Sequence, residues 1–174
     1  VTGVQTCALP IYYSENDVKT TKQLIRLTSG YYRYVVNVNS RYVQLGQELE
    51  HIQDYLRLQK MRYPNGFDYE VNCEAAMKIV PIPPFIIESF VGNAIKHGLK
   101  PGELTKIEVN VKQLEEFQIL IQVKDNGIGF SASALPLNFG FPHPILLKQF
   151  PSQETPPLHP GCHLKIQCRY LLPE

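Results

Sequence analysis

A segment near the middle of the chain carries polar residues that could bind a nucleotide. The segment Pro83–Gly98 reads PPFIIESFVGNAIKHG, and its apolar residues recur at helical spacing: Ile86, Ile87, Phe90, Val91, Ala94 and Ile95. On this predicted helix, Asn93, Lys96 and His97 fall within one turn. An amide, a cation and an imidazole should therefore lie on or beside one exposed edge.

A second group of such residues follows a predicted strand. Apolar residues alternate there with polar ones, at Ile119, Ile121 and Val123. The strand delivers Asp125 into a glycine-rich turn, DNGIG, that contains Gly127 and Gly129. A carboxylate at a strand end, glycines that allow close backbone approach, and a helix carrying Asn and Lys can together form a nucleotide pocket.

Each of these residues also has a purely structural interpretation. Asp125 begins DNG, a frequent turn signal in which the aspartate side chain accepts a hydrogen bond from the backbone. Asn93, Lys96 and His97 could be solvated residues on a helix surface. Their combination favours the nucleotide pocket over the separate structural roles.

The two motifs together resemble a known family. NAIKHG followed by DNGIGF resembles the Asn-box and first glycine box of the ATPase fold shared by histidine kinases, type II topoisomerases, Hsp90 and MutL. The flanking segments Glu48–Tyr63 (ELEHIQDYLRLQKMRY) and Ile82–Gly98 are similar to sensor histidine kinases of the LytS and YesM type. The resemblance extends from Leu45 to Phe130.

The resemblance implies an α/β fold of the α+β type. Its core would be a two-layer sandwich, in which helices cover a mixed, mainly antiparallel sheet, preceded by a helical linker. The residues themselves predict helices at 14–39 and 45–63 and strands at 67–73, 106–112 and 117–124. The short link between the last two strands predicts an antiparallel pair.

The resemblance also implies ATP and Mg²⁺ as cofactors. Asp125 matches the position that accepts from the adenine amine, and Asn93 matches the magnesium ligand, an oxygen donor of the kind that Mg²⁺ prefers. Lys96 and His97 would contact phosphates, while Gly127 and Gly129 would let the nucleotide approach the backbone.

A kinase of this family would present the ATP γ-phosphate to a histidine on a neighbouring dimerisation helix, for relay to the receiver domain of a response regulator. The family's QxxPHFLYN-like phosphoacceptor motif does not occur in this chain, and homodimerisation would use the helix that carries it. His51 is interpreted instead as a surface or interdomain histidine of the linker helix. This chain alone is therefore expected to be inactive.

Two positions depart from the family pattern. Gly92 stands where the family has a glutamate immediately before the asparagine. Ser89 stands where topoisomerase-type relatives hold the glutamate that activates water, and Glu88 lies about 100° away round the helix. Ser89 and the Glu48–Tyr63 helix favour phosphotransfer over a MutL- or Hsp90-like ATPase. Gly92 supports a further alternative, a degenerate, non-catalytic module that only docks a partner.

The remaining segments predict helix surfaces and an atypical lid region. Ser14 and Asp17 form a plausible capping pair, and Glu48 is expected to point outward from its helix. Residues 131–160 are rich in proline and show no sustained helical or strand period, where the family has a lid and a second glycine box. They are interpreted as a corrupted stretch, a lid-less variant or a disordered loop. Residues 161–174 resemble the family's closing strand.

The chain divides into three segments. Residues 1–11 resemble translated sequencing adapter and are treated as non-native. Residues 12–63 are interpreted as the remainder of a helical dimerisation or linker region, and residues 64–174 as the ATP-binding domain.

Composition limits the class of protein. The net charge of +1 does not suggest nucleic acid as a partner. Four cysteines without a CxxC pair fit a reducing compartment, and no run reaches the length of a membrane span. We expect a cytoplasmic domain whose parent protein lies in the bacterial plasma membrane, as is common in the family.

Overall fold

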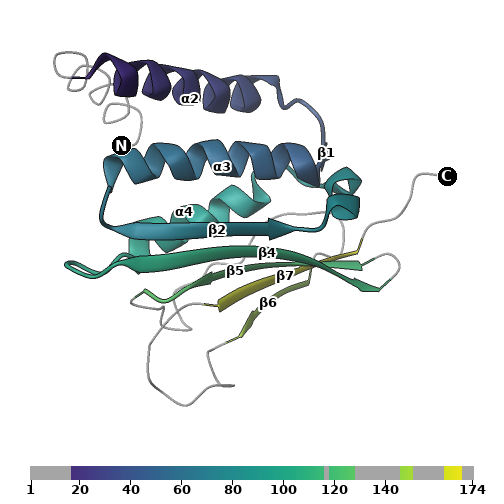
Figure 1. Cartoon of the computed structure of the whole chain (residues 1–174). Coiled ribbons are helices and arrows are strands. Elements are labelled where there is room, and N and C mark those ends of the chain that lie inside the picture. Colours follow the sequence, from purple (N-terminus) through teal and green to yellow (C-terminus); the bar gives the residue numbers. More distant parts are fainter. Residues whose placement is uncertain (1–16, 116–117, 128–145, 151–162, 170–174) are drawn as a thin grey trace.

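The computed structural model describes residues 17–115, 118–127, 146–150 and 163–169. Helices lie over one face of a five-stranded sheet (Figure 1). The strands are ordered β2-β4-β5-β7-β6, with bounds Phe67–Cys73 for β2, Thr105–Glu115 for β4, Gln118–Asp125 for β5, Leu146–Phe150 for β6 and His163–Arg169 for β7. β2 is parallel to β4, and the other neighbours are antiparallel. The predicted mixed, mainly antiparallel sheet is confirmed.

The register of the central strands explains which residues form the core. Val109 pairs with Val123, and Val111 pairs with Ile121, so that their side chains leave the sheet on one face. All four are buried. This alternation is the one visible in the sequence, and it explains why both strands could be predicted from it.

Two helices cover that face of the sheet. α3 spans Leu45–Arg62, and α4 spans Ile86–Gly98. The predicted apolar stripe of α4 is buried throughout and joins one cluster with the inner side chains of β4 and β5. A short 3₁₀-helix at Ala75–Ile79 and a two-stranded sheet, β1 (Val43–Gln44) with β3 (Pro81–Ile82), complete the connections.

The remaining helix, α2, spans Val18–Asn37 and packs on the outer side of α3 (Figure 1). Its N-cap is Asp17, whose carboxylate accepts hydrogen bonds from the backbone N–H groups of Lys19 and Thr20 at 3.0 and 3.1 Å. The prediction that this helix begins at Ser14 was therefore wrong, because an extended residue at Asp17 starts it. α2 adds an outer tier to the two predicted layers.

The proline-rich region contains a strand that the sequence did not predict. β6, Leu146–Phe150, pairs with β7 at the edge of the sheet. The sequence LLKQF has no period-two alternation, so only its pairing with β7 identifies it. β7 itself confirms the predicted closing strand. Residues 1–11, and residues 131–145 of the atypical lid region, lie outside the described residues.

Candidate functional site

The first turn of α4 is held by a carboxylate from α3. Glu48 is completely buried, and its oxygens accept hydrogen bonds from the backbone N–H groups of Phe85 and Ile87 at 3.0 and 3.2 Å. The Tyr34 hydroxyl donates to the same carboxylate at 2.6 Å. The expectation that Glu48 points outward was wrong. The first N–H groups of a helix have no acceptor within that helix, and at the start of α4 the Glu48 carboxylate is the acceptor.

The residue that precedes α4 adopts an unusual backbone conformation. Phe85 has a φ of 63°, in the left-handed region, which costs about 1–2 kcal/mol for a residue with a side chain. The Ser89 hydroxyl donates to the Phe85 carbonyl at 2.9 Å, and Glu48 binds the Phe85 N–H. These contacts hold the turn and so set where the polar edge of α4 begins.

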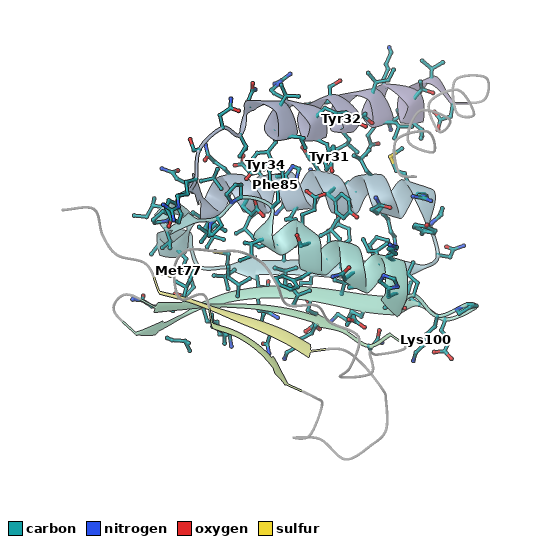
Figure 2. All side chains as sticks on the ribbon, turned by 180° about the vertical axis from the view of Figure 1, so that it is seen from behind. Tyr31, Tyr32, Tyr34, Met77, Phe85 and Lys100 are labelled. Atoms are coloured by element: carbon teal, nitrogen blue, oxygen red, sulfur yellow. The ribbon has the colours of Figure 1, made fainter. Side chains whose placement is uncertain are left out.

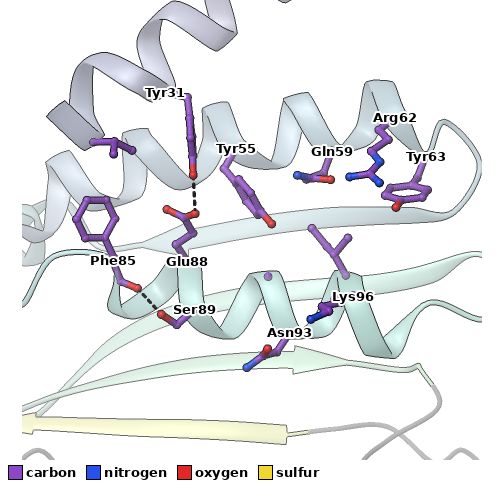
Figure 3. A pocket seen from close by; sticks show the side chains of 13 residues that line it. Tyr31, Tyr55, Gln59, Arg62, Tyr63, Phe85, Glu88, Ser89, Asn93 and Lys96 are labelled. Atoms are coloured by element: carbon purple, nitrogen blue, oxygen red, sulfur yellow. Dashed lines mark hydrogen bonds between the residues drawn. The ribbon is translucent and has the colours of Figure 1, made fainter. Parts of the chain in front are cut away.

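A cavity of about 450 Å³ lies between the polar edge of α4 and the helices α2 and α3 (Figure 3). α4 contributes Ser89, Gly92, Asn93 and Lys96 among others, and α3 contributes Tyr55, Gln59, Arg62 and Tyr63. α2 closes one wall with Tyr31 and Val35. The volume is within the usual range for small-molecule and cofactor sites, about 300–1,000 Å³.

The charged groups of this cavity suit a polyanion with a bound cation. Lys96 and Arg62 bring two cationic side chains, and Arg62 lies on α3, where the sequence did not single it out. Among the described residues lining the cavity, Glu88 alone carries a carboxylate. Asn93 adds an amide oxygen, which is a hard ligand.

Glu88 is oriented by two neighbouring helices. Its Oε1 accepts a hydrogen bond from the Tyr31 hydroxyl of α2 at 2.9 Å (Figure 3). Its Oε2 lies 2.6 Å from Nε2 of His51 on α3. The side chain remains 20% exposed. Glu88 therefore lines the cavity with a carboxylate that its neighbours hold in place. The sequence did not predict this, because it singles out Glu88 only as the neighbour of Ser89.

His51 is buried in the same interface. Its ring stacks on those of Tyr34 and Tyr31, with centroids 4.1 and 5.0 Å away, and meets the edge of Phe85. Figure 2 shows Tyr31, Tyr34 and Phe85 gathered where α2 faces α3. The interpretation of His51 as an interdomain residue fits its place between helices, but the alternative of a surface residue was wrong.

Position 92 leaves an open place on the polar edge of α4. A Cβ atom added to Gly92 would meet only the Tyr55 hydroxyl within 4 Å, at an ordinary 3.4 Å. Burial, together with the charge of Glu88, raises the pKa of Tyr55 to about 12, so that its hydroxyl stays protonated at neutral pH. The position therefore presents a neutral hydroxyl beside the gap rather than the carboxylate of the family pattern.

Asp125 lies at the C-terminal end of α4, outside the lining of the cavity. It is 6% exposed, and its Oδ1 accepts a hydrogen bond from the Gly127 N–H at 3.0 Å, which is the Asx-turn geometry expected for DNG. A Cβ at Gly98 would come within 3.1 Å of the same oxygen. The lack of a side chain at Gly98 therefore allows the carboxylate to lie against the helix.

Gly127 brings the turn after β5 into close contact with the end of α4. A Cβ there would lie 2.0 Å from the carbonyl oxygen of Gly98, which no structure can accommodate without movement. Gly98 ends α4, as predicted, but without a positive φ. Gly127 is required by this backbone contact, and Gly98 by its contact with the Asp125 carboxylate, rather than by a left-handed helix cap.

The structure thus brings some of the predicted site residues together and separates others. Asn93 and Lys96 line one cavity, and Asp125 and Gly127 meet the end of the same helix. His97 is exposed and outside the cavity lining. Gly129 lies outside the described residues.

The residues around the cavity fit ATP with Mg²⁺. Among the described residues, no group of three or more His, Cys, Asp or Glu could hold a metal by itself. The cavity lining includes two cationic side chains, Lys96 and Arg62, and the amide of Asn93. That donor set suits Mg²⁺, which is usually shared between phosphate oxygens and one or two protein groups. No helix among the described residues has the length and hydropathy needed to cross a membrane.

Comparisons with protein families cover both halves of the chain. The family "Histidine kinase" matches residues 8–67, and the family "Histidine kinase-, DNA gyrase B-, and HSP90-like ATPase" matches residues 85–154. The second match includes α4, β4 and β5, and therefore Asn93, Lys96 and Asp125.

Individual proteins give the same result. The chain is 32% identical over 119 residues to the sensor protein LytS of Staphylococcus haemolyticus, and 30% identical over 140 residues to LytS of Bacillus subtilis. These alignments cover 68% and 79% of this chain but only 20% and 22% of those proteins. The chain thus spans about a fifth of the length of the curated relatives it matches.

Solved structures support the fold. The histidine kinase domain of the blue-light activated histidine kinase from Erythrobacter litoralis EL346 aligns with a TM-score of 0.52 at 12% identity, over 92% of this chain and 83% of that one. The histidine kinase AdeS of Acinetobacter baumannii aligns with a TM-score of 0.50 at 11% identity, over 88% and 80%. The two matched families and the LytS relatives show that the chain belongs to the LytS-type sensor histidine kinases, as an ATP-binding kinase domain.

Proposed function

We propose that this chain binds Mg-ATP along the polar edge of α4 and, within the complete protein, provides the γ-phosphate for transfer to a histidine. The observation that supports this most directly is the placement of Asn93 and Lys96 in one cavity with Arg62. The buried Asp125 lies at the end of the same helix. Five residues separate Asn93 from Gly98, or about 7.5 Å along a helix axis.

Each residue has a distinct proposed role. Asn93 would offer its amide oxygen to the metal, while Lys96 and Arg62 would neutralise phosphate charge. Asp125 would accept a hydrogen bond from the exocyclic amine of adenine. When bound, Mg²⁺ would supply charge neutralisation at the phosphates, so the protein's contribution is mostly positioning.

The remaining predicted residues lie near this arrangement. His97 is exposed next to Lys96 and would contact a phosphate only from the rim of the site. Gly127 would act indirectly, by allowing the Asp125 turn to approach α4. Gly129 is proposed, as in the sequence prediction, to let the nucleotide approach the backbone.

The activity of the complete protein is part of the same proposal. The phosphoacceptor histidine would lie on a dimerisation helix of the complete protein, and the phosphoryl group would pass from it to a response regulator. The parent protein would lie in the bacterial plasma membrane, with this domain on the cytoplasmic side.

Binding of a fluorescent ATP analogue to the chain, with and without Mg²⁺, tests this proposal. We expect Mg-dependent binding that weakens about 10- to 100-fold in Asn93→Ala and in Asp125→Asn, because each removes a polar contact of roughly 1.5–3 kcal/mol. The matched controls Asn72→Ala and Asp68→Asn change exposed residues of β2 and should bind as the wild type does.

Gly92 favours a second candidate function, a kinase-derived module that docks a partner without binding nucleotide. A glycine at this position removes the family's carboxylate from the edge of α4. If the wild-type chain is folded by circular dichroism and binds no ATP analogue at any Mg²⁺ concentration, the nucleotide-binding proposal is wrong and the docking module is favoured.

A further inference from the structure

We propose that Glu88 supplies the acidic, Mg²⁺-facing group of this pocket in place of the glutamate that is missing at position 92. This role rests on the proposed binding of Mg-ATP and extends it to a residue outside the two sequence motifs. Glu88 would be the carboxylate-bearing side chain of this chain that faces the cation accompanying the nucleotide, in addition to the amide of Asn93.

Among the described residues that line the cavity, one acidic group is available to a cation. Lys96 and Arg62 would both attract phosphate, but a divalent cation needs oxygen ligands and negative charge. Among the described residues lining the cavity, only Glu88 carries a carboxylate. Asn93, in the same lining, is a neutral oxygen donor, and Mg²⁺ commonly uses one or two carboxylates in addition to phosphate oxygens.

Helix geometry places Glu88 and Gly92 on the same edge of α4. Residues four apart in a helix lie about 40° apart round its axis and one turn apart along it. The absence of a side chain at Gly92 leaves the space above this edge open, except for the Tyr55 hydroxyl at 3.4 Å from the position of a Cβ. The carboxylate of Glu88, one turn before Gly92, can therefore face the space that a side chain at position 92 would have occupied.

Glu88 is already held in place by its neighbours. Tyr31 donates to one carboxylate oxygen at 2.9 Å, and His51 lies 2.6 Å from the other. Each carboxylate has about four lone-pair positions, so these two bonds leave acceptor capacity for a cation or its water. Ligating carboxylates are typically hydrogen-bonded by such neighbouring groups, which orient them.

The two partners of Glu88 differ in the groups that they offer to its carboxylate. Tyr31 is a neutral donor. His51 can donate from Nε2, while its buried Nδ1 has no hydrogen-bond partner among the described residues. Tyr31 and His51 together fix the position of the Glu88 carboxylate at the cavity wall.

The Mg²⁺ dependence of nucleotide binding tests the proposal without measuring kinase activity. The fluorescent ATP analogue is titrated with Mg²⁺, and Mn²⁺ bound with the nucleotide is counted by electron paramagnetic resonance. We expect Glu88→Gln to raise the Mg²⁺ concentration needed for half-maximal binding about 10- to 100-fold, the effect typical of groups around a metal site. Binding measured in EDTA should remain as in the wild type.

A rescue variant separates a cation-facing role from a structural one. The double variant Glu88→Gln with Gly92→Glu returns a carboxylate to the same helix edge, and the space around Gly92 admits the added Cβ. We expect it to recover most of the wild-type Mg²⁺ dependence. Glu50→Gln is the matched control, because Glu50 is exposed on α3 and outside the cavity lining.

The outcomes distinguish this proposal from the one on which it rests. If the wild-type chain binds no nucleotide, both fail. If it binds Mg-ATP and Glu88→Gln keeps the wild-type Mg²⁺ dependence, only the role of Glu88 is overturned. If Glu88→Gln does not fold, Tyr31→Phe decides, since it keeps the carboxylate but removes one orienting donor. A higher Mg²⁺ requirement in Tyr31→Phe supports the proposal, and an unchanged one overturns it.

Discussion

At the scale of single residues, Glu48 determines how the helix that carries the site begins. Its buried carboxylate accepts hydrogen bonds from the backbone N–H of Phe85, which precedes α4, from that of Ile87 in the first turn, and from the Tyr34 hydroxyl. Burial raises the pKa of Glu48 above its usual range, while these three hydrogen bonds act in the opposite direction. The helix start therefore depends on one side chain from a distant part of the sequence.

Replacing Glu48 by alanine should lower the free energy of unfolding by about 2–4 kcal/mol, because it leaves buried donors of Tyr34 and α4 without their acceptor. Urea unfolding followed by circular dichroism measures this change. Glu50→Ala, on the exposed side of α3, is the control and should change stability by less than about 0.5 kcal/mol. A Glu48→Ala chain as stable as the control would contradict this role.

The stability difference between wild type and Glu48→Ala should depend on pH. Because the pKa of Glu48 is raised in the folded state, the folded protein holds this proton more tightly than the unfolded chain does. The resulting stabilisation is complete below the usual carboxyl pKa and is lost as pH rises through the folded value. Urea unfolding at a series of pH values should therefore show the difference shrinking from acid towards neutral.

At the scale of elements, α2 is attached to the rest of the domain by a small, separate apolar cluster. Leu24 and Leu27 of α2 pack with Leu58 of α3, apart from the main core. The polar contacts of Tyr31 and Tyr34 continue this attachment towards α4. Because Tyr31 also lines the cavity, the docking of α2 and the shape of the site are linked.

Leu24→Ala should loosen α2 without unfolding the sheet. Leu24 is fully buried, and truncating such a leucine costs about 2–5 kcal/mol. Hydrogen exchange should show faster exchange along α2 and near-unchanged exchange in β4 and β5. Ile25→Ala is the matched control, since Ile25 is 53% exposed on the same helix. Equal protection of α2 in both variants would argue against the cluster as its attachment.

At the scale of the whole molecule, the end of α4 and the turn after β5 come into close backbone contact where Gly127 approaches Gly98. This contact brings the end of β5, with Asp125, against the end of α4. The proposed adenine and phosphate regions of the site belong to different layers. Their relative position therefore depends on a backbone contact rather than on any one side chain.

Gly127→Ala should disturb this contact, because its Cβ would lie 2.0 Å from the Gly98 carbonyl oxygen. We expect a loss of about 1–3 kcal/mol in stability from overpacking, and weaker binding of the ATP analogue. Gly92→Ala is the control for stability. Its Cβ has room, and alanine within a helix is favoured over glycine by about 1 kcal/mol, so it should stabilise the fold. In thermal unfolding, we expect the midpoint temperature to fall in Gly127→Ala and to rise in Gly92→Ala.

Sequence periodicity by itself determined the regular elements and part of the site. The period of α4 separates its buried stripe from the edge with Asn93 and Lys96, and the alternation in β4 and β5 defines their inner faces. Both are local properties, since a helix repeats every 3.6 residues and a strand every two. Asp125 at the end of its strand followed from the same local reasoning.

Tertiary structure alone decided which polar residues face inward. Glu48 and His51 lie on a helix whose sequence predicts a solvated side, yet α4 and α2 cover them. The Glu88 carboxylate is held at the cavity by contacts with Tyr31 and His51, which lie on two other helices. β6 exists as a strand through its pairing with β7. In each case the partner is remote in sequence, and a buried polar group is stable only where such a partner satisfies it.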